Sequence, residues 1–456
     1  MKAQKLKAWG IPQGPLLSSF LERVGWLREE GMSIDEITAL YREVADDPEA
    51  YFKDPRISDL ARDLSATTRF VERDAPAPWK MWGRDLDPAA LKQMENACRL
   101  PVSRQGAVMP DAHRGYGLPI GGVLATEGAV IPYAVGVDIA CRMKMTVLDI
   151  PPEAIDAEAD RLSTVLEEET RFGVGAHFKE PHDHEVMDRD WNVSPITRRN
   201  KERARKQLGS SGSGNHFAEF GILTLDEPDL DLQPGRYLAL LTHSGSRGPG
   251  SAVAHHYSEL ARNTHPELPD ELKHLAWLDL DSDVGGEYWA AMTLMGEYAS
   301  ANHAVMHRQI VGSLRARALA SVENHHNFAW KEVHAGRELV VHRKGATPAG
   351  EGVLGVIPGS MTEPAFVVRG KGEATSLESA AHGAGRVMSR RHAHRTLQWK
   401  QVQAELDAHE VTLLSAGLDE APQVYKDIEE VMSHQDDLVD VVAQFQPRIV
   451  KMAPDR

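Results

Sequence analysis

Short apolar segments separated by glycine-rich turns make up most of the sequence after Met81, and the turns also carry His, Asp, Arg and Asn. Branched and aromatic residues predict strands at 235–241, 338–342 and 365–369. Helical segments are expected between them, at 251–262, 288–319 and 397–407. Because helices and strands do not alternate regularly, the pattern argues against a doubly wound parallel sheet and predicts an α+β fold.

The first 75 residues have a different pattern, that of a small helical unit. Ser33 and Glu36 have the spacing of a capping box, and apolar residues follow them at helical spacing. The proline-rich stretch 75–79 then predicts a boundary. We therefore expect a helical accessory module at 1–75, which carries no cluster of ligand or nucleophile residues, and one large domain at 76–456.

The charge balance of the chain is acidic, with 51 Lys and Arg against 67 Asp and Glu and a net charge of −16. This balance argues against a protein that coats nucleic acid through bulk charge, although it leaves room for a local basic groove. Two stretches are locally basic, at 198–206 and 382–400. The first has the pattern of a solvated helix face, whereas the second adjoins a glycine-rich turn and favours a role facing phosphate.

The two cysteines, Cys98 and Cys141, are too few and too far apart for a disulfide scaffold or a CxxC motif. We therefore expect a reducing, cytoplasmic setting. The N-terminal residues run into Gly and Pro without the apolar stretch of a signal peptide, and no segment reaches the roughly 18 apolar residues that cross a bilayer. The sequence thus predicts a soluble protein with no membrane partner.

Residue types that bind metals recur in the glycine-rich turns, and this recurrence is the strongest local signal. They are Asp138 and Cys141 in GVDIAC, His216 in GSGNHFAE, His243 in THSGSRG and His326 in ENHHNF. A lone histidine is more often a core or surface residue, and a lone cysteine is usually a small buried hydrophobe. The set as a whole suits one or two divalent ions, and ligand type alone suggests zinc. A thiolate shared by two ions would make a clamp for phosphoryl transfer.

Three turns rich in small residues form a second signal, at 209–214, 357–361 and 382–386. Backbone N–H groups in such turns can bind phosphate oxygens, because glycine permits close approach. In the third turn the imidazole of His382 precedes two glycines and Arg386. This arrangement suits an exposed nucleophile beside a phosphate anchor. The alternative is a histidine at a helix N-terminus that takes part in no chemistry.

These motifs, taken together and in this order, resemble the RtcB family of RNA ligases. The resemblance runs from about Met81 to Lys451 through MPDAHRGYGLPIGG, GVDIAC, GSGNHFAEF, HSGSRG, HHN, HRKGAT, IPGSM and SAAHGAGRVMSR, and EAPQVYKDIEEVM continues it. It implies a single large catalytic domain of the RtcB type, in which helices surround mixed and antiparallel sheets.

The activity implied by the resemblance is that of a GTP- and Mn²⁺-dependent RNA ligase. Such an enzyme joins an RNA 3′-phosphate or 2′,3′-cyclic phosphate end to a 5′-hydroxyl end, in RNA repair or tRNA splicing, and an accessory protein can assist it. By this matching, His382 is the histidine that attacks the α-phosphate of GTP and becomes guanylylated.

Two manganese ions follow from the same matching and replace the zinc that ligand type alone suggests. The Cys141 thiolate would bridge them. The matched ligands are Asp138, Cys141 and His216 for one ion and Cys141, His243 and His326 for the other. His326 is preferred to His325 because the family's ligand directly precedes an asparagine, here Asn327.

The nucleotide contacts implied by the resemblance are spread over the second half of the chain. They are Asn215, His216, Phe217, Ala218, Glu219, His326, Asn327, Pro358, Gly359, Ser360, Met361, His382, Gly383, Ala384, Gly385 and Lys451. Arg247, Lys344 and Arg390 match positions suited to grip RNA or triphosphate oxygens, and arginine can do so in a bidentate geometry.

Three departures from the family pattern bear on specificity. Residues 362–365, Thr-Glu-Pro-Ala, replace the small residues and the serine that usually follow IPGSM near guanine, so the guanine preference could be weakened. Lys451 is followed by 452–456 instead of Lys-Gly ending the chain, and residues 1–75 lie outside the resemblance. Two other functions stay open, a metal-dependent phosphoesterase acting on RNA ends and a protein that binds broken RNA ends without sealing them.

Overall fold

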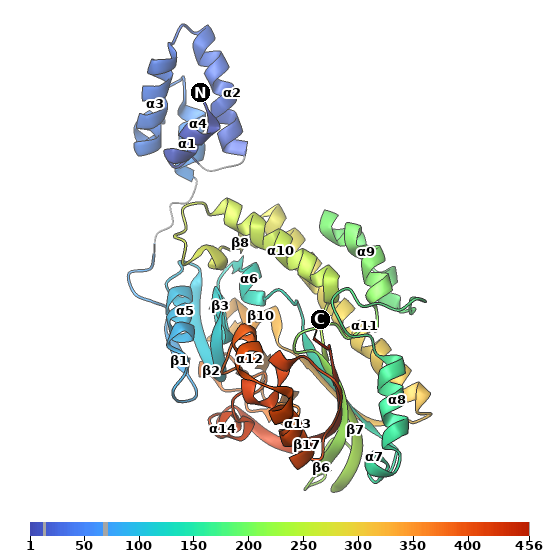
Figure 1. The fold of residues 1–456 in the computed structure, drawn as a ribbon. Coiled ribbons are helices and arrows are strands. Elements are labelled where there is room, and N and C mark those ends of the chain that lie inside the picture. The colour runs from blue at the N-terminus through green and yellow to red at the C-terminus, as the bar shows by residue number, and fades with distance from the viewer. Residues whose placement is uncertain (12–14, 67–71, 456) are drawn as a thin grey trace.

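The computed structural model describes residues 1–11, 15–66 and 72–455. Helices and strands follow one another in a mixed order, and the strands form mixed and antiparallel sheets (Figure 1). The predicted α+β fold is therefore confirmed. None of the helices in these residues is long and apolar enough to cross a membrane.

The N-terminal residues form a bundle of short helices with an apolar core of its own (Figure 1). Its elements are α1 (Ala3–Ala8), α2 (Pro15–Glu29), α3 (Ile34–Asp46), the 3₁₀ turn η1 (Pro48–Tyr51) and α4 (Ser58–Ala66). The predicted capping box is present, because the Ser33 hydroxyl accepts from the Glu36 amide at 3.3 Å and the Glu36 carboxylate accepts from the Ser33 amide at 2.8 Å. Two parts of the predicted module, residues 12–14 and 67–71, lie outside the described residues, and its boundary near 75 stays a prediction.

A five-stranded mixed sheet follows the bundle. Its strand order is β1 (Trp79–Met81), β2 (Ser103–Tyr116), β3 (Leu118–Thr126), β11 (Arg337–Lys344) and β10 (Asn327–His334). Within this sheet the β1–β2 pair is parallel and the other pairs are antiparallel. Helix α5 (Pro88–Cys98) packs on β2 and β3.

An eight-stranded sheet has most of the ligand-type residues at or next to the ends of its strands. Its main path is β13 (Leu354–Pro358), β14 (Ala365–Gly370), β17 (Val439–Met452), β6 (Phe217–Leu225), β7 (Gly235–Ser244), β5 (Arg142–Leu148) and β9 (Ala318–His325), and β16 (Thr412–Ser415) pairs with β17. The three segments predicted as strands lie in β7, β11 and β14. The chain passes directly from β9 of this sheet to β10 of the other, so the two sheets meet there.

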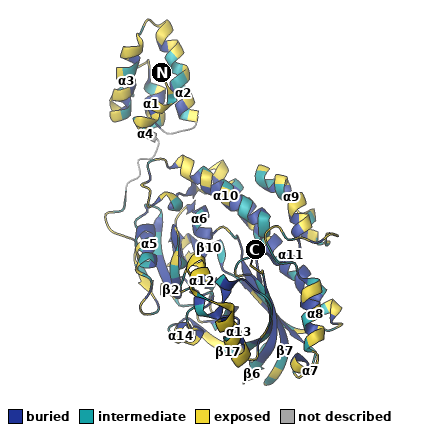
Figure 2. Ribbon diagram, viewed as in Figure 1, coloured by how far each residue is buried: buried dark blue, intermediate teal, exposed yellow. Residues whose placement is uncertain are grey.

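Helices α8 (Ala159–Glu169) and α11 (Asp283–Ser313) pack on the eight-stranded sheet (Figure 1). Leu166 of α8 and Met306 of α11 meet Phe220 and Leu240 of the sheet in one buried apolar cluster. Figure 2 agrees with this packing, since buried residues run along the sheet and exposed residues lie on the outer sides of the helices. Burial of these apolar faces is the main force that holds the layers together.

The predicted helix at 288–319 is wrong at its C-terminal end, since α11 stops at Ser313 and β9 begins at Ala318. Arg315 adopts a left-handed φ of 52° just after the helix, and the Ala316 amide donates back to the Val311 carbonyl at 3.1 Å. Alanines in this stretch favour a helix by propensity, but pairing with β5 overrides that preference.

The remaining elements are mostly short. The helices are α6 (Pro132–Val135), α7 (Ala154–Ala157), α9 (Pro195–Gln207), α10 (Arg247–Thr264), α12 (Arg390–Thr396), α13 (Trp399–Ala408) and α14 (Ile428–Ser433). The strand pairs are β12 (Ala346–Pro348) with β15 (Ser379–Ala381) and β4 (Ala129–Val130) with β8 (Leu278–Asp279). The 3₁₀ turns are η2 (Glu185–Asp188), η3 (Trp191–Val193), η4 (Lys273–Leu275), η5 (Ala374–Ser376), η6 (Leu418–Glu420) and η7 (Pro422–Val424). The segments predicted as helices at 251–262 and 397–407 correspond to α10 and α13.

Candidate active site

Neighbouring strands of the eight-stranded sheet bring candidate metal ligands to one end of that sheet. In the register of β5 with β9, Arg142 lies opposite His325. Cys141 and His326, which adjoin this pair in sequence, therefore lie at the same end. His243 is close to the end of β7, the other neighbour of β5. Strand pairing thus gathers residues that are far apart along the chain.

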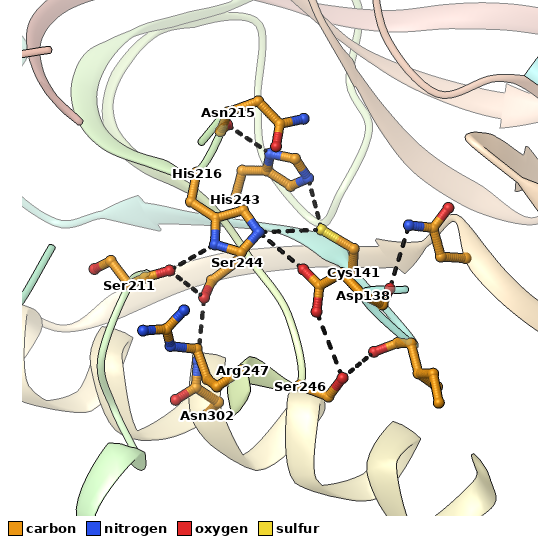
Figure 3. Close-up of polar contacts among 12 residues, drawn as sticks. Asp138, Cys141, Ser211, Asn215, His216, His243, Ser244, Ser246, Arg247 and Asn302 are labelled. Atoms are coloured by element: carbon orange, nitrogen blue, oxygen red, sulfur yellow. Dashed lines mark hydrogen bonds and ion pairs between the residues drawn. The ribbon is translucent and has the colours of Figure 1, made fainter. Parts of the chain in front are cut away.

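Asp138, Cys141 and His216 form one set of ligand atoms, all within 4.8 Å of one another (Figure 3). The Asp138 carboxylate lies 2.9 Å from Nε2 of His216, and Sγ of Cys141 lies 3.5 Å from the same nitrogen. The turn that carries Asp138 and Cys141 includes Ala140 at a left-handed φ of 55°, and the Ala140 amide donates to the Asn327 carbonyl at 2.6 Å. The backbone therefore fixes the directions of both side chains.

Cys141, His243 and His326 form a second set of ligand atoms. Sγ of Cys141 lies 3.0 Å from Nε2 of His243, which in turn lies 3.2 Å from Nε2 of His326. The structure thus brings together all five residues that the sequence singled out, and Cys141 is the member common to both sets.

Hydrogen bonds to backbone carbonyls fix the protons of two of these imidazoles. Nδ1 of His216 lies 2.7 Å from the Ser211 carbonyl, and Nδ1 of His243 lies 2.9 Å from the Asn215 carbonyl (Figure 3). Because a carbonyl only accepts, each Nδ1 carries the proton and each Nε2 presents a lone pair towards Cys141. Lone pairs, a carboxylate and a sulfur that converge in this way repel one another unless a cation lies between them. The five residues therefore fit a site for divalent metal ions.

Burial affects metal binding by this cluster in two opposite ways. It keeps the imidazoles neutral, which favours metal binding, and it keeps the thiol protonated, which opposes it. It lowers the pKa of His243 to about 3 and that of His326 well below its usual value, so both imidazoles stay neutral near pH 7. Burial, together with the Asp138 carboxylate, raises the pKa of the Cys141 thiol well above its usual value. A bound divalent ion would counter this effect and stabilise the thiolate.

Polar side chains behind His216 support the loop that carries it (Figure 3). Oγ of Ser244 donates to the Ser211 carbonyl at 2.7 Å, the same carbonyl to which His216 donates. Asn302 of α11 donates from Nδ2 to the Ser210 carbonyl at 3.0 Å. Neither supporting side chain was predicted. The visible signal for Asn302 is a polar residue that interrupts an apolar stripe at helical spacing.

A cavity of about 790 Å³ opens beside the metal-ligand cluster. The predicted site residues in its wall are Asp138, Cys141, Asn215, Phe217, Glu219, His243, His326, Asn327, Lys344, Pro358, Gly359, Ser360, Met361, His382, Gly383, Ala384, Gly385 and Arg390. Turns and strand ends from several separate motifs therefore surround one space.

His382 lies in the wall of this cavity, and Asp111 orients its imidazole. Asp111 is fully buried, and its Oδ2 lies 2.5 Å from Nδ1 of His382 and accepts from the His382 amide at 3.1 Å. A carboxylate accepts only, so Nδ1 carries the proton and Nε2 keeps a lone pair. The His382 ring centroid lies 4.9 Å from that of His326. A nitrogen able to act as a nucleophile is therefore oriented next to the metal-ligand cluster.

Three residues predicted as nucleotide contacts are not in the cavity wall, namely His216, Ala218 and Lys451. Successive side chains of a strand point to opposite faces. The residues of β6 and β17 that do line the cavity are Phe217, Glu219, Val450 and Met452. Nζ of Lys451 donates instead to the carbonyls of Leu166 and Glu167, at 3.1 and 3.2 Å. The Lys451 side chain therefore lies on the face of the sheet away from this cavity, and its contact with a nucleotide stays a prediction.

The three residues predicted to grip phosphate have different surroundings. Lys344 lies in the cavity wall, and burial lowers its pKa to about 7. Arg390 is also in the wall, but its guanidinium pairs with Asp419 and Glu420. Arg247 lies outside the wall, next to the metal-ligand cluster (Figure 3).

The two basic stretches of the sequence differ in their exposure and in their ion pairs. Residues 198–206 lie in α9, and their arginines are exposed, as predicted for a solvated helix face. In the stretch 382–400, Arg386 pairs with Glu420 at 3.2 Å, the same carboxylate that Arg390 contacts. These two arginines of the second stretch thus have acidic partners within the fold.

In the segment 362–365, which departs from the family pattern, residues 362–364 lie in the turn between β13 and β14, and Ala365 begins β14. Glu363 lies in the cavity wall, as does Glu219. Burial raises the pKa of both carboxyl groups. Thr362 points elsewhere, since its hydroxyl donates to the Glu405 carboxylate at 3.3 Å. The cavity wall therefore includes two carboxyl groups with raised pKa values.

Fold and site together define the class of this protein, an α+β protein with a buried two-centre metal-ligand cluster and an oriented imidazole beside one large cavity. The family model described as tRNA-splicing ligase RtcB matches residues 93–452. The chain belongs to the RtcB family, and the resemblance noted in the sequence is confirmed. The N-terminal helical bundle lies outside the matched residues.

Several relatives of known name support this membership. RNA-splicing ligase RtcB1 of Escherichia coli strain ATCC 25922 is 34% identical over 399 residues, which cover 80% of this chain and 95% of the relative. RNA-splicing ligase RtcB of Escherichia coli K12 shows the same identity over the same shares. The tRNA-splicing ligase RtcB of Pyrobaculum aerophilum is 32% identical over 445 residues, with 80% of this chain and 90% of the relative covered.

Proposed function

We propose that this protein is a GTP- and Mn²⁺-dependent RNA ligase that acts in RNA repair or tRNA splicing. It joins an RNA 3′-phosphate or 2′,3′-cyclic phosphate end to a 5′-hydroxyl end through a guanylate on His382. The observation that supports this proposal best is the imidazole of His382, which Asp111 orients at 2.5 Å in the same cavity wall as the metal-ligand cluster. Family membership supplies the reaction class.

The chemistry of the first step falls to His382 and Asp111. Nε2 of His382 attacks the α-phosphorus of GTP, so that an N–P bond forms while the bond to the bridging oxygen breaks and pyrophosphate leaves. Asp111 keeps the proton on Nδ1 and stabilises the positive charge that the ring acquires. Two bound divalent ions, ligated by the cluster around Cys141, would supply charge neutralisation for the phosphoryl groups.

The cavity also contains a candidate recognition group for guanine. Glu219 is buried in the wall, and Phe217, Met361 and Val450 provide apolar surface nearby. Guanine presents two donors on one edge, N1–H and the N2 amino group. Hydrogen bonds from both would stabilise the Glu219 carboxylate against the burial that raises its pKa, whereas the equivalent edge of adenine offers an acceptor at N1. We therefore favour GTP over ATP, with Glu219 as the discriminating residue.

The proposal is tested by incubating the protein with Mn²⁺ and α-labelled GTP or ATP, followed by denaturing gel electrophoresis, mass spectrometry and addition of RNA ends. A GMP adduct on His382 and a joined RNA are expected. An AMP adduct would support the covalent mechanism but would show that ATP, and not GTP, is the nucleotide used. Phosphate release from an RNA 3′-phosphate without any adduct would favour a phosphoesterase, and RNA binding without turnover would favour an end-binding protein.

Replacing Asp111 by asparagine is expected to slow adduct formation by about 10- to 1000-fold. The asparagine amide can donate to Nδ1, which favours the tautomer with the proton on Nε2 and removes the nucleophilic lone pair. Single-turnover labelling with GTP measures the rate. Asp226→Asn, at an exposed position after β6, is the matched control. An unchanged rate in Asp111→Asn would show that Asp111 does not set the tautomer.

Removing the N-terminal helical bundle is expected to leave the joining of a short model RNA within about twofold of the full chain, since a unit with its own core can fold separately. The apolar core of the bundle is made only of side chains between Met1 and Leu64. A chain that starts at residue 72 therefore loses none of the core around the cavity. Loss of joining in a variant that still melts cooperatively would instead assign the bundle to the joining machinery.

A further inference from the structure

Tyr116 lies at the tip of the β2–β3 hairpin and in the wall of the cavity. Its exposed fraction is 67%, against 43% for Trp26 and 40% for Trp399, the other exposed aromatic side chains among the described residues. One edge of the ring contacts the imidazole of His274, with 5.6 Å between the ring centroids, and most of the remaining surface of the Tyr116 side chain is open to solvent at the cavity wall. The metal-ligand cluster and the nucleotide contacts give Tyr116 no role.

The backbone beneath this ring is fixed. Nζ of Lys344 donates to the Tyr116 carbonyl at 2.5 Å. The side chain of Gln93 donates to the Gly115 carbonyl at 2.7 Å and accepts from the Gly115 amide at 2.9 Å. Gly117 has a left-handed φ of 70° and packs so closely on a neighbouring carbonyl that a Cβ there would lie 2.8 Å from it. The ring is thus exposed on a rigid support, which lowers the entropic cost of binding.

The same tip lies close to the reacting histidine. Lys344, which contacts the Tyr116 carbonyl, precedes Gly345 in the chain. A Cβ built on Gly345 would lie 3.1 Å from Cε1 of His382. Tyr116 and His382 are therefore connected through two consecutive residues in one cavity wall.

A positive charge accompanies the ring. Arg114 is two residues before Tyr116 on β2, and both side chains are exposed and line the cavity. An aromatic ring beside a guanidinium is the combination with which proteins hold single-stranded nucleic acid, the ring stacking on a base and the cation contacting a phosphate.

We propose that Tyr116 is a stacking platform for the terminal base of an RNA end that enters the cavity, with Arg114 contacting a phosphate of the same end. Stacking tolerates any base, because every base has a π-face. The platform orients the end towards His382 without selecting its sequence. This inference rests on the proposed function, which supplies RNA ends as the substrate.

The test is a double-mutant cycle on RNA binding. Binding of a short labelled RNA is measured by fluorescence anisotropy for wild type and Tyr116→Ala, with intact RNA and with RNA whose 3′-phosphate or 5′-hydroxyl terminal nucleotide is abasic. Tyr116→Ala should weaken binding of intact RNA by about 5- to 100-fold, the range of one base stacked on an aromatic ring. With one of the two abasic RNAs, the same substitution should have little further effect.

Two variants make the result specific. Tyr116→Phe keeps the ring and should retain wild-type binding. Trp399→Ala removes an exposed aromatic side chain outside the cavity wall and should also bind normally. An effect of Tyr116→Ala that is equally large on intact and on both abasic RNAs, or no effect at all, would overturn the platform.

A failure of the stacking platform can be told apart from a failure of the proposed function, because RNA binding is measured without turnover. Failure of wild type to form a GMP adduct or to join RNA would overturn the ligase proposal and leave a measured coupling between Tyr116 and a terminal base intact. A wild-type enzyme that joins RNA but shows no coupling would overturn the platform alone.

Discussion

Replacing His382 by alanine is expected to abolish both the covalent GMP adduct and the joining of RNA, with a loss of at least about 10³-fold. Two nearby imidazoles in the cavity wall are held by other contacts: Nδ1 of His113 lies 3.2 Å from the Asp111 carbonyl. His326 has its ring 4.9 Å away, but its Nε2 faces His243 at 3.2 Å within the metal-ligand cluster. Labelling with α-labelled GTP, followed by mass spectrometry of the peptide that contains position 382, measures the adduct.

The matched control is His255→Ala, which removes an exposed histidine on α10, away from the cavity. It should form the adduct at the wild-type rate. Addition of imidazole to His382→Ala tests the assignment further, because a free imidazole can occupy the vacated space and restore part of the turnover. An adduct that survives in His382→Ala at the wild-type level would assign the nucleophile to another residue.

Replacing Cys141 by alanine is expected to weaken manganese binding at both centres by more than about 100-fold, since even the outer partners of metal ligands contribute 10- to 100-fold. Sγ of Cys141 lies 3.0 Å from Nε2 of His243 and 3.5 Å from Nε2 of His216, and it belongs to both ligand sets. Its loss therefore affects two centres at once. Manganese per protein after dialysis, measured by mass spectrometry, gives the result.

Cys98→Ala is the control for this experiment, because it removes the other cysteine of the chain, which is buried beside Met94 of α5. It should keep both ions. His243→Ala offers a finer comparison, since His243 belongs to one ligand set only and its loss should affect one ion more than the other. A Cys141→Ala protein that retains two manganese ions per chain would refute the bridging thiolate.

Local chemistry allowed part of the fold to be predicted from the sequence. The start of α3 follows from the reciprocal bonds of Ser33 and Glu36, which need nothing beyond four consecutive residues. The end of α11 does not, because residues such as Ala318 belong to β9 through pairing with a strand about 170 positions earlier. Long-range pairing has no local signature in a single sequence.

The candidate site, like the fold, could be predicted only in part from the sequence. Ligand-type residues in glycine-rich turns could be named from their own chemistry, whereas their separation into two sets around Cys141 came from the family resemblance, because it depends on the strand order β7-β5-β9. Asp111 was missed, because it lies in an irregular part of β2 between Val108 and His113 where the pairing with β3 shifts. For Lys451 the family match gives a position in the chain, but not the face of β17 on which the side chain lies, and the structure places that side chain outside the cavity wall.

The spread of the metal ligands along the chain has a consequence for the order in which this protein is made. Asp138 leaves the ribosome long before His326, and β5 cannot complete its pairing until β9 has been synthesised. Contacts of such long range form late in folding. The nascent chain therefore has no complete second metal centre until His326 has emerged, and His382 follows later still. The candidate metal ligands and His382 are thereby all present only when nearly the whole polypeptide exists.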